Sequence, residues 1–208
     1  MAARGEDRRE KILEVAQCIV LQKGFSTTSI DEIIDGAHIT KGGFFYHFKG
    51  KGDLARHLLE RYLQQDEQFF NNLFEKADAL SEDPLQQMLL FLKLYAQAME
   101  DLPGAHPGCL VAAYTYESQQ FDDEIKRLTA EGMLSWRELF EERLARIAAR
   151  YPMRIEVSLT ELADMLTSVI EGSIVVSRVF STQAVLAEQL LQYRTYLRLL
   201  FNDASLLS

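Results

Sequence analysis

A short basic stretch holds the residues of this 208-residue chain that are best suited to binding a polyanion. Residues 36–52 contain no Asp or Glu. Cations and aromatic residues alternate along them: Lys41, Phe44, Tyr46, His47, Phe48, Lys49 and Lys51. Thr40 adds a hydroxyl group, and Gly42 and Gly43 allow another molecule to approach the backbone closely. The stretch therefore predicts a surface that meets phosphate groups.

The charge of the whole chain argues at first against that partner, because the net charge is −9. Its distribution is uneven. Residues 1–52 carry eight Lys and Arg against seven Asp and Glu, a net charge of +1, so the other 156 residues carry −10. Salt screens a surface charge beyond about 10 Å, so phosphate contact depends on the local charge. The acidity therefore belongs to the body of the chain.

Nearly every segment has the apolar spacing of an amphipathic helix. Helix starts are marked by Ser29 with a capping-box acid at Glu32, by Thr40, and by Ser81–Asp83 before Pro84. The predicted helices cover about residues 6–24, 30–36, 40–47, 51–76, 84–102, 108–117, 122–150, 158–180 and 182–202. No strand pattern or repeat stands out, so we predict an all-α fold of about nine helices.

Residues 29–48 have the spacing of a helix-turn-helix, in which the second helix enters the DNA major groove. A helical hairpin with a solvated basic end has the same spacing. The residues 24–54, GFSTTSIDEIIDGAHITKGGFFYHFKGKGDL, resemble the N-terminal signature of the TetR family of one-component transcriptional regulators. The resemblance is specific over about residues 8–60. It implies a DNA-binding helix-turn-helix domain over residues 1–50 and a ligand-binding and dimerisation domain over residues 51–208.

The resemblance further implies a dimeric repressor that a small-molecule effector releases from a pseudo-palindromic double-stranded DNA operator. It implies DNA contacts for Thr28, Thr40, Lys41, Gly42, Gly43, Phe44, Tyr46, His47, Lys49 and Lys51. Lys41 and Phe44 are the expected readers of base edges. Thr28 is expected to cap the helix over residues 30–36 or to touch a phosphate. Lys51 is expected to meet a phosphate. Phe45 stands where the family usually has tyrosine, and we expect it in the core.

The body of the chain offers candidates for an effector pocket, because aromatic residues and Met with a few polar groups suit an apolar ligand. The candidates are Met88, Phe91, Tyr95, Met99, Tyr114, Glu117, Trp136, Phe140, Met165 and Glu171. Ordinary core packing produces the same stripes. Cys109, which begins a helix after His106, is a candidate for ligand binding or for sensing electrophiles and oxidants. Its alternative role is that of a small buried thiol, and we expect Cys18 to pack.

Two C-terminal helices are candidates for a dimer interface. Residues 158–180 are apolar nearly all round, and residues 182–202 carry an apolar stripe at Leu186, Leu190, Tyr193, Leu197 and Leu200. We expect a homodimer through residues 158–202, and the alternative is that these helices complete a monomer core.

Other classes of protein are less consistent with the sequence. The four His include no i,i+4 pair, and there is no Cys-x-x-Cys or Gly-rich phosphate loop, so we expect no enzyme, metal or cofactor. A helical module that binds proteins remains open. The longest stretch without Asp, Glu, Lys or Arg has 15 residues, too few for a transmembrane helix. Two cysteines and a charged start predict a cytoplasmic protein.

Overall fold

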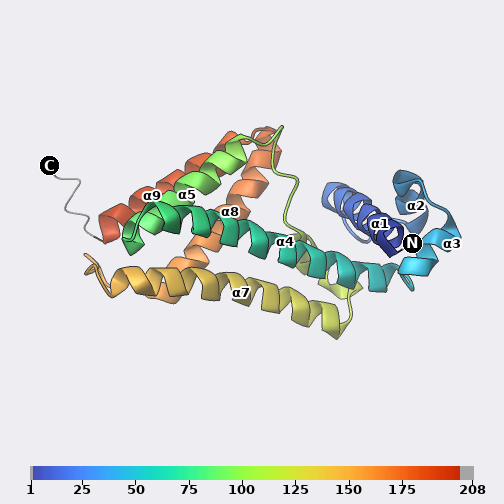
Figure 1. Cartoon of the computed structure of the whole chain (residues 1–208), viewed down its shortest axis with the longest axis horizontal. Helices are drawn as coiled ribbons and strands as arrows, with labels where there is room; N and C mark the ends of the chain where they lie inside the picture. Colours follow the sequence, from blue (N-terminus) through green and yellow to red (C-terminus); the bar gives the residue numbers. More distant parts are fainter. Residues whose placement is uncertain (1, 202–208) are drawn as a thin grey trace. The chain divides into compact units, whose positions relative to one another are not determined.

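The computed structural model describes residues 2–201, and its side chains are described from Gly5 onward (Figure 1). Within this range the chain forms nine α-helices, one short 3-10 helix and no strand, which confirms the all-α prediction. In chain order they are α1 (Ala2–Lys23), α2 (Ile30–Ala37), α3 (Lys41–His47), α4 (Lys51–Leu80), α5 (Pro84–Glu100), α6 (Leu110–Tyr116), η1 (Ser118–Gln120), α7 (Asp123–Ala148), α8 (Leu159–Phe180) and α9 (Ala184–Leu200).

Contacts divide the chain into two compact units. Unit 1 holds the chain up to Asp66 together with Pro107–Gly132. Unit 2 holds Glu67–His106 together with the chain from Met133 onward. Unit 1 thus contains α1–α3, the first half of α4 and the whole of α6. This grouping differs from the expected functional boundary at residue 50, which remains a prediction.

Local capping fixes where the helices of unit 1 begin. The Ser29 hydroxyl accepts the Glu32 N–H at 3.2 Å, and the Glu32 carboxylate accepts the Ser29 N–H at 2.9 Å, so the predicted capping box is present. The Thr40 hydroxyl accepts the Gly43 N–H at 3.1 Å, as expected for the start of α3. His38 ends α2 in the left-handed conformation with φ of 54°.

The core of unit 1 joins α1 to the two short helices. α1 packs against α2 and α6, and α2 packs against α3. Gly36 allows close approach of α2 to α1, because a Cβ atom there would lie 2.8 Å from the Val15 side chain. The fully buried apolar side chains of this core include Ile12, Leu13, Ala16, Ile33, Phe44, Phe48 and Leu58.

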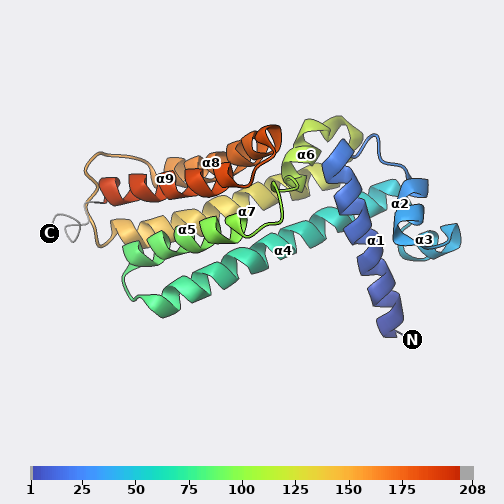
Figure 2. The same cartoon turned by 90° about the horizontal axis from the view of Figure 1, so that it is seen from above.

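Unit 2 contains a layer of helices in which α9 packs against both α5 and α8 (Figure 2). Leu186, Leu190, Tyr193, Leu197 and Leu200 of α9 are all buried within the chain. The Tyr193 hydroxyl donates to the Leu162 carbonyl of α8 at 2.8 Å. The expectation that this stripe meets a second copy is therefore wrong, because α5 and α8 of the same chain cover it. None of the helices in the described part of the chain has the length and apolar character needed to span a membrane.

The capping box predicts a pH dependence of stability. Hydrogen bonds from Lys23 and Ser29 lower the pKa of Glu32 from its ordinary value of 4.5 to about 2. Because the pKa is lower in the folded chain, Glu32 stabilises the fold above pH 4.5, and this contribution is lost as the pH falls towards 2. Denaturant unfolding measured from pH 7 to pH 2 should show that the free energy of unfolding falls less with pH for Glu32→Gln than for the unchanged chain. An equal dependence in both would contradict this role of Glu32.

Candidate nucleic-acid interface

Helix α3 presents one face to solvent and one to the core of unit 1. Lys41, Gly42, Phe45 and Tyr46 are exposed, as is Lys49 directly after the helix, and Tyr46 is 83% exposed. The Thr40 hydroxyl accepts one hydrogen bond at the start of α3 and keeps its own proton for another acceptor. These residues form an exposed face with cations, donors and aromatic surface, which we call the α3 face.

The two phenylalanines of α3 have exchanged the places predicted for them. Phe44 is 0% exposed and packs edge-on against Phe45 and, at 5.7 Å between ring centroids, against Phe48. Phe45 is 47% exposed. The predictions that Phe44 reads base edges and that Phe45 lies in the core are therefore wrong. A seven-residue helix carries too few apolar positions for its phase to be read from the sequence.

Thr28 also departs from its predicted role. Ser29, not Thr28, is the N-cap of α2. Thr28 is 2% exposed, and its hydroxyl donates to the Gly24 carbonyl at 2.7 Å. The structure therefore places Thr28 inside unit 1, where it closes the turn between α1 and α2.

A carboxylate from the C-cap of α6 holds the loop that precedes α2. Glu117 accepts the Phe25 N–H at 2.8 Å and the Ser26 N–H at 2.7 Å. Lys51, at the start of α4, donates to the Ser26 carbonyl at 3.2 Å, and its ammonium lies 4.4 Å from the centre of the Phe25 ring. We call Glu117, Lys51, Phe25 and Ser26 the loop clamp. Lys51 thus contacts its own chain, and its expected phosphate contact stays a prediction.

The electrostatics of the loop clamp agree with its geometry. Burial would raise the pKa of Glu117, but hydrogen bonds from Ser26 and Phe25 and the charge of Lys51 outweigh burial and lower that pKa. Burial lowers the pKa of Lys51, and the Glu117 carboxylate opposes this shift. Gly24 completes the arrangement with φ of 91°, and a Cβ atom there would lie 2.6 Å from a Glu117 oxygen. Only glycine combines a positive φ with the absence of a Cβ atom, so only glycine fits here without strain.

The predicted effector residues fall into different units. Tyr114 and Glu117 lie in unit 1, where the buried Tyr114 hydroxyl donates to the Ala55 carbonyl at 3.1 Å. The remaining aromatic and Met candidates on α5 and α7 are buried inside unit 2: Met88, Phe91, Tyr95, Met99, Trp136 and Phe140. On α8, Glu171 is half-buried, whereas Met165 is exposed. The candidate effector residues therefore do not all lie in one unit or in one kind of environment.

The two cysteines also differ in their surroundings. Cys109 is buried, and its Sγ accepts the Ala112 N–H at 3.4 Å as the N-cap of α6. This is the arrangement of a small buried thiol. Cys18 is exposed on α1, so the expectation that it packs is wrong.

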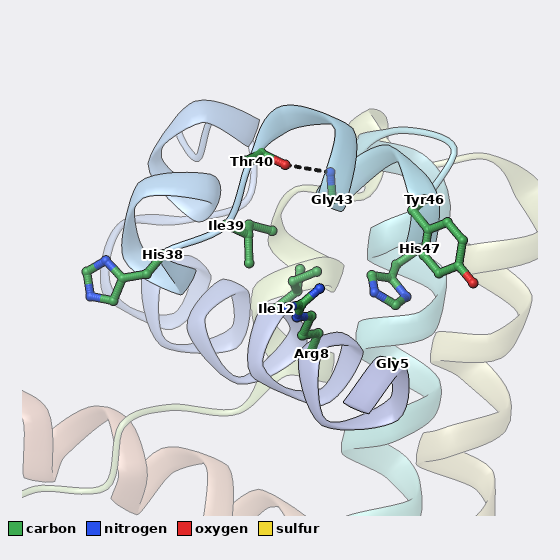
Figure 3. A pocket seen from close by; sticks show the side chains of 9 residues that line it. All are labelled: Gly5, Arg8, Ile12, His38, Ile39, Thr40, Gly43, Tyr46 and His47. Carbon is green, nitrogen blue, oxygen red and sulfur yellow. Dashed lines mark hydrogen bonds between the residues drawn. The ribbon is translucent and has the colours of Figure 1, made fainter. Parts of the chain in front are cut away.

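A pocket of 580 Å³ opens between α1 and α3 (Figure 3). It is lined by Gly5, Arg8, Ile12, His38, Ile39, Thr40, Gly43, Tyr46 and His47, none of which is acidic. Figure 3 shows the Arg8 and His47 side chains projecting into it from opposite sides. The His38 ring lies at the far end and points away from them. The pocket thus extends the α3 face onto α1.

His47 in this pocket is influenced by two cations of α1. Burial lowers the pKa of His47, and the nearby cations Arg9 and Arg8 lower it further. His47 is therefore neutral near pH 7, and its ring offers one donor and one acceptor nitrogen. Arg8 is a residue that the sequence predictions missed, because it lies 32 positions before Thr40 in a segment of mixed charge. The packing of α1 on α2 and the contact of Arg9 with Phe48 place this part of α1 beside α3.

Comparison with known proteins identifies the family. Residues 12–58 match the family described as bacterial regulatory proteins, tetR family. Residues 84–189 match the C-terminal domain of the LmrA/YxaF-like transcriptional regulators, a match that spans just over half of the chain. The chain belongs to the TetR family of transcriptional regulators. The resemblance seen in residues 24–54 is thereby confirmed.

Curated TetR-family proteins resemble the chain at low identity. The HTH-type transcriptional regulator LmrA of Bacillus subtilis is 27% identical over 82% of this chain and 86% of its own length. The HTH-type transcriptional repressor DhaR of a Mycobacterium species is 22% identical over 80% of both chains. The transcriptional regulator AcuR of Cereibacter sphaeroides is 29% identical, but the match spans only 55% of AcuR and 58% of this chain.

Solved structures share the TetR fold. A TetR-family regulator from Agrobacterium tumefaciens superposes with a TM-score of 0.77 at 19% identity, and covers 95% of this chain and 99% of its own. The reduced form of Escherichia coli NemR superposes with a TM-score of 0.72 at 18% identity, over 91% of this chain and 96% of NemR.

The loop clamp predicts a specific loss of stability. Glu117→Gln keeps one acceptor oxygen but removes the charge that holds two N–H groups and faces Lys51. We expect the free energy of unfolding to fall by about 1–2 kcal/mol. Glu124→Gln is the matched control, since Glu124 is an exposed acid of α7 in unit 1 and should cost less than about 0.5 kcal/mol. Chemical denaturation of both variants measures the difference, and equal losses would rule out the clamp.

Proposed function

We propose that the chain is a dimeric repressor that binds a pseudo-palindromic DNA operator through the α3 face and leaves it when a small molecule binds in unit 2. It acts in the cytoplasm, where the chromosome and the effector are both accessible. Its relatives LmrA and DhaR are named as a transcriptional regulator and a transcriptional repressor, which supports this function.

The observation that carries the proposal is the exposed, acid-free α3 face on a helix that follows a capped helix and a tight turn. The second helix of such a pair enters the major groove and its flanks meet the phosphates. Lys41 is an exposed residue of the first turn of α3 and can reach base edges with its ammonium group. Phe45 and Tyr46 replace Phe44 as the aromatic residues that face DNA.

An exposed apolar face on α8 supports a dimer. Met165, Val175, Val176, Val179 and Phe180 are exposed, and Val179 is 73% exposed. At 100° per residue these positions fall on one side of the helix, together with Gly172, beside which there is open space. A second copy that presents the same face covers these side chains in a two-fold contact. The two α3 faces then bind half-sites about 34–36 Å apart or a multiple of this distance.

We place the effector among the aromatic residues of unit 2. Phe70 and Phe74 of α4 meet Phe91 and Tyr95 of α5, and Phe74 and Phe91 stack with ring centroids 3.8 Å apart. Apolar and aromatic surroundings of this kind suit a small apolar molecule. Such a molecule lowers operator affinity only if it binds more tightly to a conformation that fits DNA poorly.

Selection of bound duplexes from random DNA tests the proposed DNA binding. We expect one enriched pseudo-palindromic sequence, and Lys41→Ala should weaken its binding by about 1–3 kcal/mol and change the preferred bases. Lys93→Ala, an exposed lysine of α5 in unit 2, is the matched control and should bind as the unchanged chain does. Failure to enrich any sequence would overturn the proposal. Repeating the selection with candidate effectors tests release.

The dimer has a test of its own. Val179→Glu places a charge on the exposed face of α8 and should convert the dimer to a monomer in sedimentation. Leu80→Glu changes an equally exposed apolar residue at the end of α4 and should leave the dimer intact. A Val179→Glu variant that sediments as the unchanged chain does would show that this face is not the interface.

A further inference from the structure

The pocket described in unit 1 is lined by one arginine, Arg8, which has no role in the functions assigned above. The pocket lies between α1 and α3, and Arg8 and His47 project into it from opposite sides (Figure 3). Thr40 lines the same pocket and retains a hydroxyl proton to donate. Donor groups of three different kinds therefore line the same pocket, and no acidic side chain is among the lining residues.

The neighbouring cations of α1 are already engaged, whereas Arg8 is not. Arg9 lies over the Phe48 ring, with its guanidinium carbon 5.5 Å from the ring centre. Lys11 pairs with Glu14 at 2.9 Å. Among the described side chains, Arg8 has no ion-pair or hydrogen-bond partner. An exposed, unpaired guanidinium beside a neutral imidazole is suited to bind an anion.

The position of the pocket indicates which anion it binds. Thr40, Gly43, Tyr46 and His47 belong to α3 or its N-cap, so the pocket adjoins the α3 face. A helix lying in the major groove has the sugar-phosphate backbone along its flanks. Guanidinium groups bind phosphate oxygens through two parallel hydrogen bonds, a geometry that lysine lacks.

We propose that this pocket binds one backbone phosphate of the operator, with Arg8 of α1 as its main ligand and His47 and Thr40 as further donors. Helix α1 thereby becomes part of the DNA interface, and its phosphate contact fixes how α3 is oriented in the groove. The inference rests on the proposed DNA binding, since it names a contact within that interface. It assigns Arg8 to positioning on the backbone and leaves base recognition to the α3 face.

The test measures operator affinity of the full chain at several KCl concentrations, with the duplex obtained by selection. Each phosphate contact contributes about 0.9 to the slope of log K against log salt, so Arg8→Gln should reduce the slope by about 0.9 for each head. The affinity for non-cognate duplexes should fall by the same factor as for the operator, because phosphates carry no sequence information. Arg8→Lys keeps the charge and should keep most of the slope.

Lys11→Gln is the matched control, because it removes one cation from the same helix outside the pocket. Its slope should equal that of the unchanged chain. If the original chain binds its operator but Arg8→Gln has the same salt slope, the phosphate contact is overturned and the proposed function is not. Absence of salt-dependent binding by the unchanged chain overturns the proposed function itself.

A free phosphate ion is the alternative ligand for this pocket. Inorganic phosphate, compared with chloride at equal ionic strength, should not displace the duplex if the pocket is built for a backbone phosphate. Displacement by inorganic phosphate at low concentration, lost in Arg8→Gln, would instead identify a free-anion site and overturn the assignment to DNA. Thermal unfolding should be unchanged in Arg8→Gln, since Arg8 is exposed.

Discussion

The two hydrogen bonds that Glu117 accepts from the loop before α2 are the constraint on which the DNA-facing unit depends. Without a partner, the N–H groups of Phe25 and Ser26 would be left for solvent beside a core of aromatic rings. The carboxylate accepts both of them, and Lys51 donates to the carbonyl group of the same loop. The Phe25 and Ser26 N–H groups and the Ser26 carbonyl of this loop are therefore all hydrogen-bonded. The loop is followed directly by Ser29, the N-cap of α2, so its position determines where α2 and α3 begin.

The loop clamp also engages two charged residues for which the sequence predicted other roles. Lys51 was predicted to meet a phosphate and Glu117 to contact an effector, and both roles stay predictions. Within unit 1 the charge of each group favours the ionised form of the other. Lys41, Lys49 and Arg8 are exposed, and we propose that they supply the charge that faces DNA. We expect the acidic remainder of the chain to repel DNA and so to limit non-specific binding.

Local features of the sequence predicted the fold well. The caps at Ser29, Thr40 and Asp83 are interactions between residues three positions apart, so a single sequence contains all the information needed to find them. Helical spacing likewise predicted the nine helices of the described chain, with boundaries that shift by a few residues.

The site was less predictable because its decisive contacts are long-range. Glu117 meets Ser26 across 91 positions, and Lys51 meets the same residue across 25. Arg8 lies beside α3 because α1 packs on α2, a contact between distant parts of the sequence. The exchange of Phe44 and Phe45 has another cause, since a helix of seven residues completes barely two turns and does not define its own buried side.

Hydrogen–deuterium exchange of the full chain with and without its selected duplex tests the central claim most directly, because it needs no variant. The account predicts slower exchange over residues 38–48 and around Arg8 on α1, with no change over the buried stripe of α9. Slowed exchange confined to the acidic helices of unit 2, with residues 38–48 unaffected, would contradict it.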